Sequence, residues 1–337
     1  MSDRATIGFA GCGGCGTPHA PGDRFCEQCG ASLESTSAPA DRDACSSCGA
    51  APGARDEDGY CTICGLRGRA RGDRDELDLS AAAAVSDQGL VHRRNEDAFH
   101  LEVVAERHGA AVVCDGISSA TAGDLAAQGA ARAAGRALAL AAGDPSSDAI
   151  VATLGAIRAA GDAVELVPWS PEVDRAMPSC TLVSALWRDG ELVIGWIGDS
   201  RAYWLTEDGC RQLTTDDSWA AEQVAAGTIT ADEAARDSRF HAITHWVGAD
   251  APARPPQVVT LRPEHPGRLM LCSDGLWNYA PRAADLAALV DALPAAAGPA
   301  AVARSLTETA LARGGRDNIT VAVIDIEPED PARRRHQ

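Results

Sequence analysis

Short apolar runs bounded by glycine or polar residues recur through most of the chain, from about residue 77 onward. Runs of about four to eight apolar residues are typical of β-strands. They predict strands near 81–85, 98–104, 110–114, 180–187, 191–197, 200–205, 257–261, 268–272 and 318–325. Longer alanine-rich segments predict helices near 122–141, 147–164, 283–292 and 298–313.

The order of these elements indicates the fold class. Strands and helices do not alternate regularly, which disfavours a doubly wound parallel sheet. The segment "WRDGEL" places Asp189-Gly190 between two apolar runs, where such a dipeptide favours a tight hairpin turn. We therefore predict an α+β domain over 77–327, an antiparallel sandwich covered by helices. The stretch 214–250, which begins "TTDDSW", is long for a loop and is expected to be functional or mobile.

Eight of the 12 cysteines precede residue 65, all in C-x-x-C pairs. Two such pairs can complete a tetrahedral thiolate site for zinc. The two sets are Cys12, Cys15, Cys26 and Cys29, and Cys45, Cys48, Cys61 and Cys64. We predict two structural Zn²⁺ ions in four-cysteine zinc ribbons at 8–33 and 45–66, with a linker at 34–44 and a charged linker at 67–76. Redox C-x-x-C motifs are the alternative, but no βαβ pattern surrounds them.

Charge and hydropathy limit the classes of partner that the chain is expected to bind. The net charge is -18, and residues 1–66 carry nine acidic and four basic residues. Phosphate backbones need a positive field, so protein docking by the ribbons is expected rather than nucleic-acid binding. No run of about 18 apolar residues or secretory signal occurs, so no membrane partner is expected. A reducing, cytoplasmic location fits metal-binding cysteines.

Acidic residues stand at the edges of several apolar runs in the main domain. Asp115 follows "AAVVC", Asp199 follows "LVIGWIG" and Asp274 follows "RLMLCS". Carboxylates that converge at strand ends repel each other and lose hydration, so cations are the natural compensation. Oxygen ligands favour Mg²⁺ or Mn²⁺ over zinc, and two such ions can activate a water for attack on a phosphoryl group.

Seven segments in order carry a resemblance to a known family. They are "SDQGLVHRRNEDAF", "VVCDGISSATAG", "SCTLVSAL", "IGDSRAYWL", "AITHWVGAD", "LCSDGLW" and "RDNITVAVI". Together they resemble the metal-dependent serine/threonine phosphatases of the PPM (protein phosphatase 2C) type over about residues 77–326. The resemblance implies a β-sandwich of two antiparallel sheets flanked by helices, in α-β-β-α layers, with metals in a cleft at one end.

The resemblance also implies catalytic roles for three aspartates. Asp115 would bridge two Mg²⁺ or Mn²⁺ ions, and the carbonyl of Gly116 would bind one of them. Asp274 and Asp317 would complete the shell of the other ion. A water activated by the two ions would then attack the phosphorus of phosphoserine or phosphothreonine.

Four further residues have supporting roles by the same resemblance. Glu96 and Asp97 would bind metal directly or through water, and Asp199 would help to hold a weaker third ion. Asn318 would position an aspartate or a water from behind the metal ligands. The expected partners are phosphoprotein substrates, including a serine/threonine kinase or its targets, whose signalling the enzyme would oppose.

The sequence departs from the family pattern at several positions. His92 stands where the family has a phosphate-contacting arginine, with Arg93 beside it. Ser118 and Ser119 replace glycines, and Asn278 replaces an acid near the third metal. These departures favour an alternative, a catalytically weak or inactive phosphatase-fold scaffold or phosphoprotein binder that works through its zinc ribbons. The three intact catalytic aspartates favour the enzyme.

Overall fold

The computed structural model describes residues 10–11, 18–19, 62–63, 73–174 and 176–328 of the chain. The chain divides into two compact units, Met1–Ala70 and Arg71–Gln337. In the first unit, β1 (Ala10–Gly11) pairs antiparallel with β2 (Pro18–His19). The eight cysteines predicted to bind zinc all lie outside the described residues, so the zinc ribbons stay a prediction.

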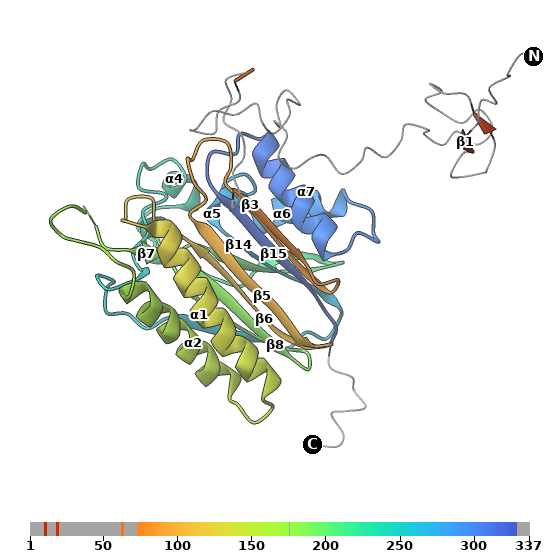
Figure 1. The fold of residues 1–337 in the computed structure, drawn as a ribbon, viewed down its shortest axis with the longest axis horizontal. Helices are drawn as coiled ribbons and strands as arrows, with labels where there is room; N and C mark the ends of the chain where they lie inside the picture. Colours follow the sequence, from red (N-terminus) through yellow and green to blue (C-terminus); the bar gives the residue numbers. More distant parts are fainter. Residues whose placement is uncertain (1–9, 12–17, 20–61, 64–72, 175, 329–337) are drawn as a thin grey trace, which may run out of the picture. The chain divides into compact units, whose positions relative to one another are not determined.

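Two antiparallel sheets form the centre of the second unit (Figure 1). The first has the order β11-β10-β14-β15-β4-β3. Its strands are β3 (Arg74–Asp78), β4 (Ala82–Asp87), β10 (Arg201–Thr206), β11 (Gly209–Gln212), β14 (Gly267–Cys272) and β15 (Ile319–Ile326). The second has the order β13-β9-β8-β6-β5. Its strands are β5 (Asp97–Ala105), β6 (His108–Asp115), β8 (Leu182–Arg188), β9 (Glu191–Ile197) and β13 (Gln257–Leu261).

Helices cover both outer faces of this sandwich (Figure 1). The second sheet packs on α1 (Gly123–Gly143) and α2 (Ala149–Glu165). The first sheet packs on α5 (Asp274–Trp277), α6 (Ala283–Asp291) and α7 (Pro299–Ala312). Three apolar clusters, one between the sheets and one under each helical layer, make the core. The described residues therefore form the expected α-β-β-α layers.

The predicted elements all occur, with ends within about two residues of those expected. The Asp189-Gly190 turn is confirmed, because φ is 48° at Asp189 and 78° at Gly190. Positive φ at both central residues matches the type I′ turn that joins twisted antiparallel strands.

The predicted linker at 67–76 is wrong at its end. Arg74–Asp78 forms β3, an edge strand that pairs with β4 along its whole length. Its sequence, "RDELD", contains one apolar residue, so hydrophobic alternation does not predict a strand there. The backbone ladder and ion pairs stabilise it instead, since Arg74 contacts Glu76 at 2.7 Å and the buried Asp87 at 3.0 Å.

The long segment 214–250 contains three short elements. These are α3 (Trp219–Ala225), α4 (Ala231–Ala234) and β12 (Val247–Gly248), which pairs with β7 (Ser179–Cys180). Ser218 caps α3 and Thr230 caps α4 through their side-chain oxygens. The segment is thus folded, and its two ends are joined by a bridge between Ser218 and Ile243.

Small residues in α1 allow the helix to lie close to its sheet. A Cβ on Gly135 would come 2.1 Å from the ring of His100 in β5, so the helix could not approach as closely with a larger residue.

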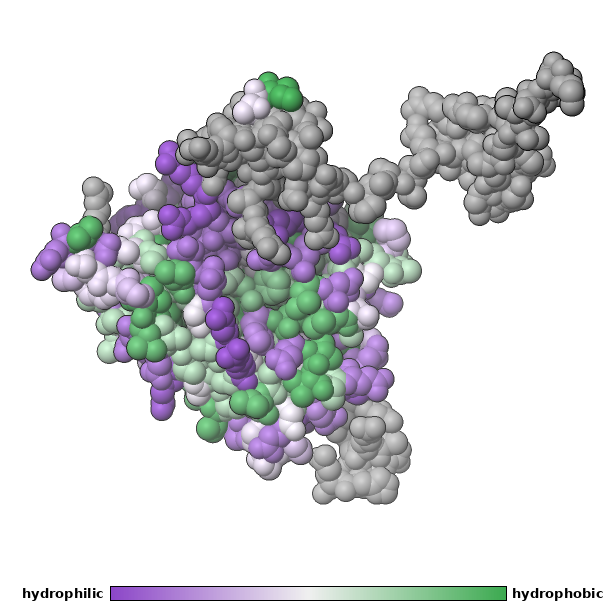
Figure 2. Space-filling view, viewed as in Figure 1, coloured by the Kyte–Doolittle hydropathy of each residue, from purple (hydrophilic) through white to green (hydrophobic). Residues whose placement is uncertain are grey.

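None of the described helices is long and apolar enough to cross a membrane. Hydrophobic and hydrophilic residues are interspersed on the face that carries α1 and α2 (Figure 2).

The packing of α1 predicts a contrast between two leucines. Leu138 is fully buried, whereas Leu140 is 78% exposed. Leu138→Ala should lower the free energy of unfolding by about 2–5 kcal/mol through a lost contact and a cavity, and Leu140→Ala by about 0.5 kcal/mol or less. Urea unfolding followed by tryptophan fluorescence measures both, because all seven tryptophans lie in the second unit. Equal effects of the two substitutions would contradict this packing.

Candidate active site

Aspartates from both sheets meet at one end of the sandwich. Asp97 begins β5 and Asp115 ends β6, and the two face each other in the antiparallel register. Asp274 follows β14 as the first residue of α5, and Asp317 lies two residues before β15. The structure therefore brings these four predicted residues together, because the apolar strands that carry them begin or end at the same end of the sandwich.

Glycine after aspartate allows the backbone segments to approach each other here. A Cβ on Gly275 would lie 1.9 Å from the carbonyl oxygen of Asn318, and one on Gly116 would lie 2.5 Å from that of Gly123. No larger residue fits without movement of the backbone. The Asp-Gly pairs thus serve close packing of the loops that carry Asp115 and Asp274.

Asn318 ties its own loop to the segment between β4 and β5. Its Oδ1 accepts a hydrogen bond from the Glu96 amide at 2.8 Å, and its Nδ2 donates to the carbonyl oxygens of Gln88 at 2.7 Å and Arg94 at 3.1 Å. The Glu96 carbonyl in turn accepts from the Gly116 amide at 3.0 Å. Asn318 therefore acts on the backbone around the carboxylates, which is compatible with the supporting role expected of it.

Buried hydroxyl groups, which the sequence analysis did not single out, orient the carboxylates. Ser273 Oγ donates to Asp97 Oδ2 at 2.7 Å and accepts from the Thr320 amide at 2.9 Å. Thr181 Oγ1 accepts from the Asp115 amide at 3.2 Å and pairs with Ser200 Oγ at 2.7 Å. A hydroxyl residue directly before Asp274-Gly275 was the only local sequence signal.

Burial makes this cluster electrostatically unfavourable without cations. Loss of hydration, followed by nearby negative charge, raises the pKa of Asp97 and of Asp274 to about 7. The same causes raise the pKa of Asp115 and of Asp199 well above the usual range. Asp97 Oδ1 and Asp274 Oδ1 are buried with no hydrogen-bond partner.

The donor set fits hard cations. Asp274 is close enough for its negative charge to raise the pKa of Asp115, so two charged carboxylates there need a proton or a cation nearby. In the described part of the chain, no group of three or more His, Cys, Asp or Glu side chains is arranged to hold a metal ion. Mg²⁺ commonly binds one or two carboxylates and keeps several waters, so such ions do not require a closed cage of side chains.

Asp199 joins the cluster from the first sheet. It is buried just before β10, and its carbonyl oxygen accepts from Trp277 Nε1 at 2.9 Å. Burial is the main cause of its raised pKa, and the charge of Asp274 is the next. Asn278 Nδ2 donates to Asp274 Oδ2 at 3.2 Å, so this departure from the family pattern places an amide against a carboxylate.

The other predicted residues surround the aspartates. His92 Nε2 lies 3.2 Å from Asp317 Oδ1, whereas Arg93 is exposed. Burial raises the pKa of Glu96. Ser118 and Ser119 are exposed in a turn closed by a hydrogen bond from the Ala120 amide to the Ile117 carbonyl.

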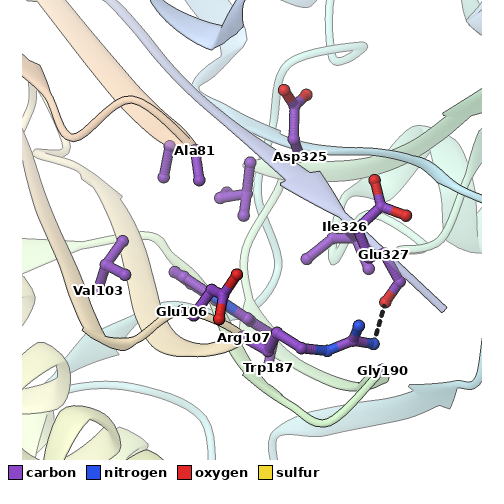
Figure 3. A pocket seen from close by; sticks show the side chains of 11 residues that line it. Ala81, Val103, Glu106, Arg107, Trp187, Gly190, Asp325, Ile326 and Glu327 are labelled. Atoms are coloured by element: carbon purple, nitrogen blue, oxygen red, sulfur yellow. Dashed lines mark hydrogen bonds between the residues drawn. The ribbon is translucent and has the colours of Figure 1, made fainter. Parts of the chain in front are cut away.

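Two cavities border the aspartates and a third lies away from them. One of about 550 Å³ is lined by Asp199, Trp277 and α3, and one of about 440 Å³ by Asp97 and Arg132. The third, of about 280 Å³, is lined by Trp187 and the C-terminal end of β15 (Figure 3). Asp317 precedes the start of that strand, so the third cavity lies at the opposite end of the sandwich.

Comparison with known proteins identifies the family. A family model described as "Protein phosphatase 2C" matches residues 91–310. The chain belongs to the protein phosphatase 2C family. It is 28% identical to the serine/threonine phosphatase stp of Listeria innocua over 71% of this chain and 93% of that protein. It is 32% identical to the serine/threonine protein phosphatase PstP of Mycobacterium tuberculosis over 74% of this chain and 45% of that protein.

Solved structures agree with this assignment. The PstP/Ppp phosphatase of Mycobacterium tuberculosis has 30% identity and a TM-score of 0.59, over 73% of this chain and 98% of that one. The MsPP phosphatase of Mycobacterium smegmatis, solved with cacodylate, has 30% identity and a TM-score of 0.60, over 74% and 100%. The PstP catalytic domain with two manganese ions has 27% identity and a TM-score of 0.57, over 73% and 98%. The predicted enzyme class, a protein serine/threonine phosphatase, is confirmed.

The raised carboxyl pKa values predict how stability changes with pH. Asp97 and Asp274 have a pKa of about 7 when folded, against 3.8 ordinarily, so folding favours their protonated forms. This stabilisation is complete below about pH 4 and is lost as the pH rises through about 7. One pKa unit corresponds to about 1.4 kcal/mol, so the metal-free Tm should fall by about 3 °C or more between about pH 5 and 8.

Thermal unfolding followed by tryptophan fluorescence in chelator tests this dependence. Asp274→Asn should weaken it, whereas Asp208→Asn, at an exposed turn, should leave it unchanged. Added Mn²⁺ should raise the Tm more at the higher pH, where the carboxylates are charged. A metal-free Tm that stayed constant or rose with pH would contradict the raised pKa values.

Proposed function

We propose that the chain hydrolyses phosphoserine and phosphothreonine in proteins with two Mg²⁺ or Mn²⁺ ions, opposing a serine/threonine kinase. The observation that carries the proposal is the meeting of Asp97, Asp115 and Asp274 at the strand ends, with two buried carboxylate oxygens that lack partners. Such oxygens in an apolar surrounding are costly unless a cation or proton compensates them.

Asp115, Asp274 and Asp317 would hold the ions, with help from the Gly116 carbonyl. Glu96 and Asp97 would bind directly or through water, and Asp199 would contribute to a weaker third site. When bound, the ions supply Lewis acidity to a water molecule and to the phosphoryl oxygens.

The remaining groups orient the substrate and the carboxylates. His92, beside Asp317, and Arg93 are the proposed phosphate contacts at the mouth of the site. Ile117 follows Gly116 and has no ionisable group that could donate a proton, so the leaving serine or threonine oxygen would take its proton from solvent. Asn318 would keep the loops of Glu96 and Gly116 in register through the bonds described above.

We further propose that the first unit contains two zinc ribbons that dock partner proteins or regulate the phosphatase unit. Their support is the repeated C-x-x-C spacing and the acidic balance of residues 1–66. Segments this short cannot fold by core burial alone, so bound zinc would supply most of their stability.

Phosphate release from a phosphothreonine peptide, measured with Mn²⁺ or Mg²⁺ titrated in, tests the reaction. Asp274→Asn should lower kcat about 100-fold or more, because it removes a charge that holds the ions. Asp208→Asn, an exposed substitution of the same kind, should retain the activity. Wild-type protein that released no phosphate with either ion would refute the enzyme and favour the scaffold.

Zinc content measured by mass spectrometry of the full chain tests the ribbons. Two zinc ions per chain are expected, and Cys12→Ser should reduce the content to about one because a site loses one of its four ligands. Cys210→Ser, at a half-buried thiol of the second unit, serves as the matched control and should keep both ions. A chain purified without zinc and unable to bind it would overturn the ribbons while leaving the phosphatase proposal intact.

A further inference from the structure

Asp217 has a buried carboxylate that receives donors from several parts of the chain. It is 3% exposed. Its Oδ2 accepts from the Gly198 amide at 3.0 Å, and its Oδ1 accepts from Gln257 Nε2 at 2.9 Å. Arg254 Nη1 lies 3.4 Å from Oδ1, and His245 Nδ1 lies 3.4 Å from Oδ2. Gly198 and His245 therefore contact Oδ2, whereas Gln257 and Arg254 contact Oδ1.

The backbone of Asp217 is hydrogen-bonded to Gly198 as well. Its amide donates to the Gly198 carbonyl at 2.9 Å, and its own carbonyl accepts from the Thr244 amide at 2.8 Å. Gly198 thus has both backbone groups bonded to one residue. Its φ of +102° is a conformation that only glycine adopts readily, and a Cβ there would lie 2.8 Å from Thr181 Cβ.

The next residue after this turn is Asp199. The carbonyl of Asp199 is bonded to Trp277, and Ser200 is bonded to Thr181, which also accepts from the Asp115 amide. Contacts therefore run without a break from Asp217 through Gly198 to the aspartates of the site. Displacement of the turn would change where the Asp199 carboxylate points.

We propose that Asp217 is a positioning residue that holds the Gly198–Asp199 turn so that Asp199 faces the metal-binding aspartates. It also ties this turn to both ends of the segment 218–243, through Thr244 and through Arg254, which pairs with Glu222 of α3 at 2.9 Å. The inference rests on the proposed function, since it concerns how that site is oriented. The adjacent Asp216 is engaged elsewhere, in an ion pair with Arg201 at 2.7 Å.

Three substitutions separate the hold on Gly198 from the charge of Asp217. Asp217→Ala removes every side-chain contact. Asp217→Asn keeps one oxygen that can face the Gly198 amide, although its NH₂ cannot accept from Arg254. Arg254→Gln removes the positive charge and leaves the bond to Gly198 in place.

The first measurement is kcat and KM of the full chain on a phosphothreonine peptide with Mn²⁺. Asp217→Ala should lower kcat about tenfold or more with KM nearly unchanged, because a misplaced group costs transition-state stabilisation. Asp217→Asn should recover most of the loss, and Arg254→Gln should remain within about twofold of wild type. If Asp217→Ala does not fold, Asp217→Glu replaces it, because the extra methylene keeps the charge and displaces the oxygens from Gly198.

The second measurement counts free Mn²⁺ by electron paramagnetic resonance, which requires no turnover. Asp217→Ala should bind Mn²⁺ more weakly than wild type, and Asp217→Asn nearly as tightly. Wild-type kcat and Mn²⁺ binding in Asp217→Ala, with only a lower Tm, would overturn the proposal and leave Asp217 a purely structural residue. If the wild-type chain released no phosphate, the proposed function would fail, but the Mn²⁺ comparison would still decide the role of Asp217.

Discussion

The carboxyl groups of Asp97 and Asp115 lie opposite each other where β5 begins and β6 ends, in surroundings that raise the pKa of both. Asp274 adds a third carboxylate, and two oxygens of the group have no donor. The hydrogen bond from Ser273 to Asp97 reduces this cost but cannot remove it, because a buried negative charge needs a positive one nearby. Cations at this end would therefore serve stability as well as chemistry, which links the fold of the second unit to its reaction.

The sandwich can hold these charges in place because its parts approach each other closely. Alanine and glycine in α1 allow the helix to lie against β5, since a Cβ at Gly135 would come 2.1 Å from the ring of His100. Gly275 brings the loop of Asp274 against Asn318 in the same way. Close packing leaves few alternative positions for the loops, so the carboxylates are oriented before any ion binds.

The sequence predicted the strands and the acidic residues at their ends, because apolar runs that stop at Asp115 or Asp274 are visible locally. It did not predict β3, whose mostly charged residues form a strand only through pairing with β4. The sequence also assigns no role to Asp217, which lies in the "TTDDSW" segment. The partners of Asp217, Gly198 and Gln257, are distant in sequence, and only the fold brings them to one carboxylate.

The departures at His92 and Asn278 can be understood together from the charges that they touch. His92 contacts Asp317, and Asn278 contacts Asp274, so each places a donor on a proposed metal ligand. The two departures differ in kind, because His92 stands in place of an arginine that would contact phosphate, whereas Asn278 stands in place of an acid that would help to hold a third ion. A neutral amide in place of a carboxylate removes one charged ligand, so a third ion would be held more weakly beside Asp274. Asp115, Asp274 and Asp317, the proposed ligands of the two main ions, are all present, so the departures would weaken the phosphate contact and the third-ion site rather than the pair of ions.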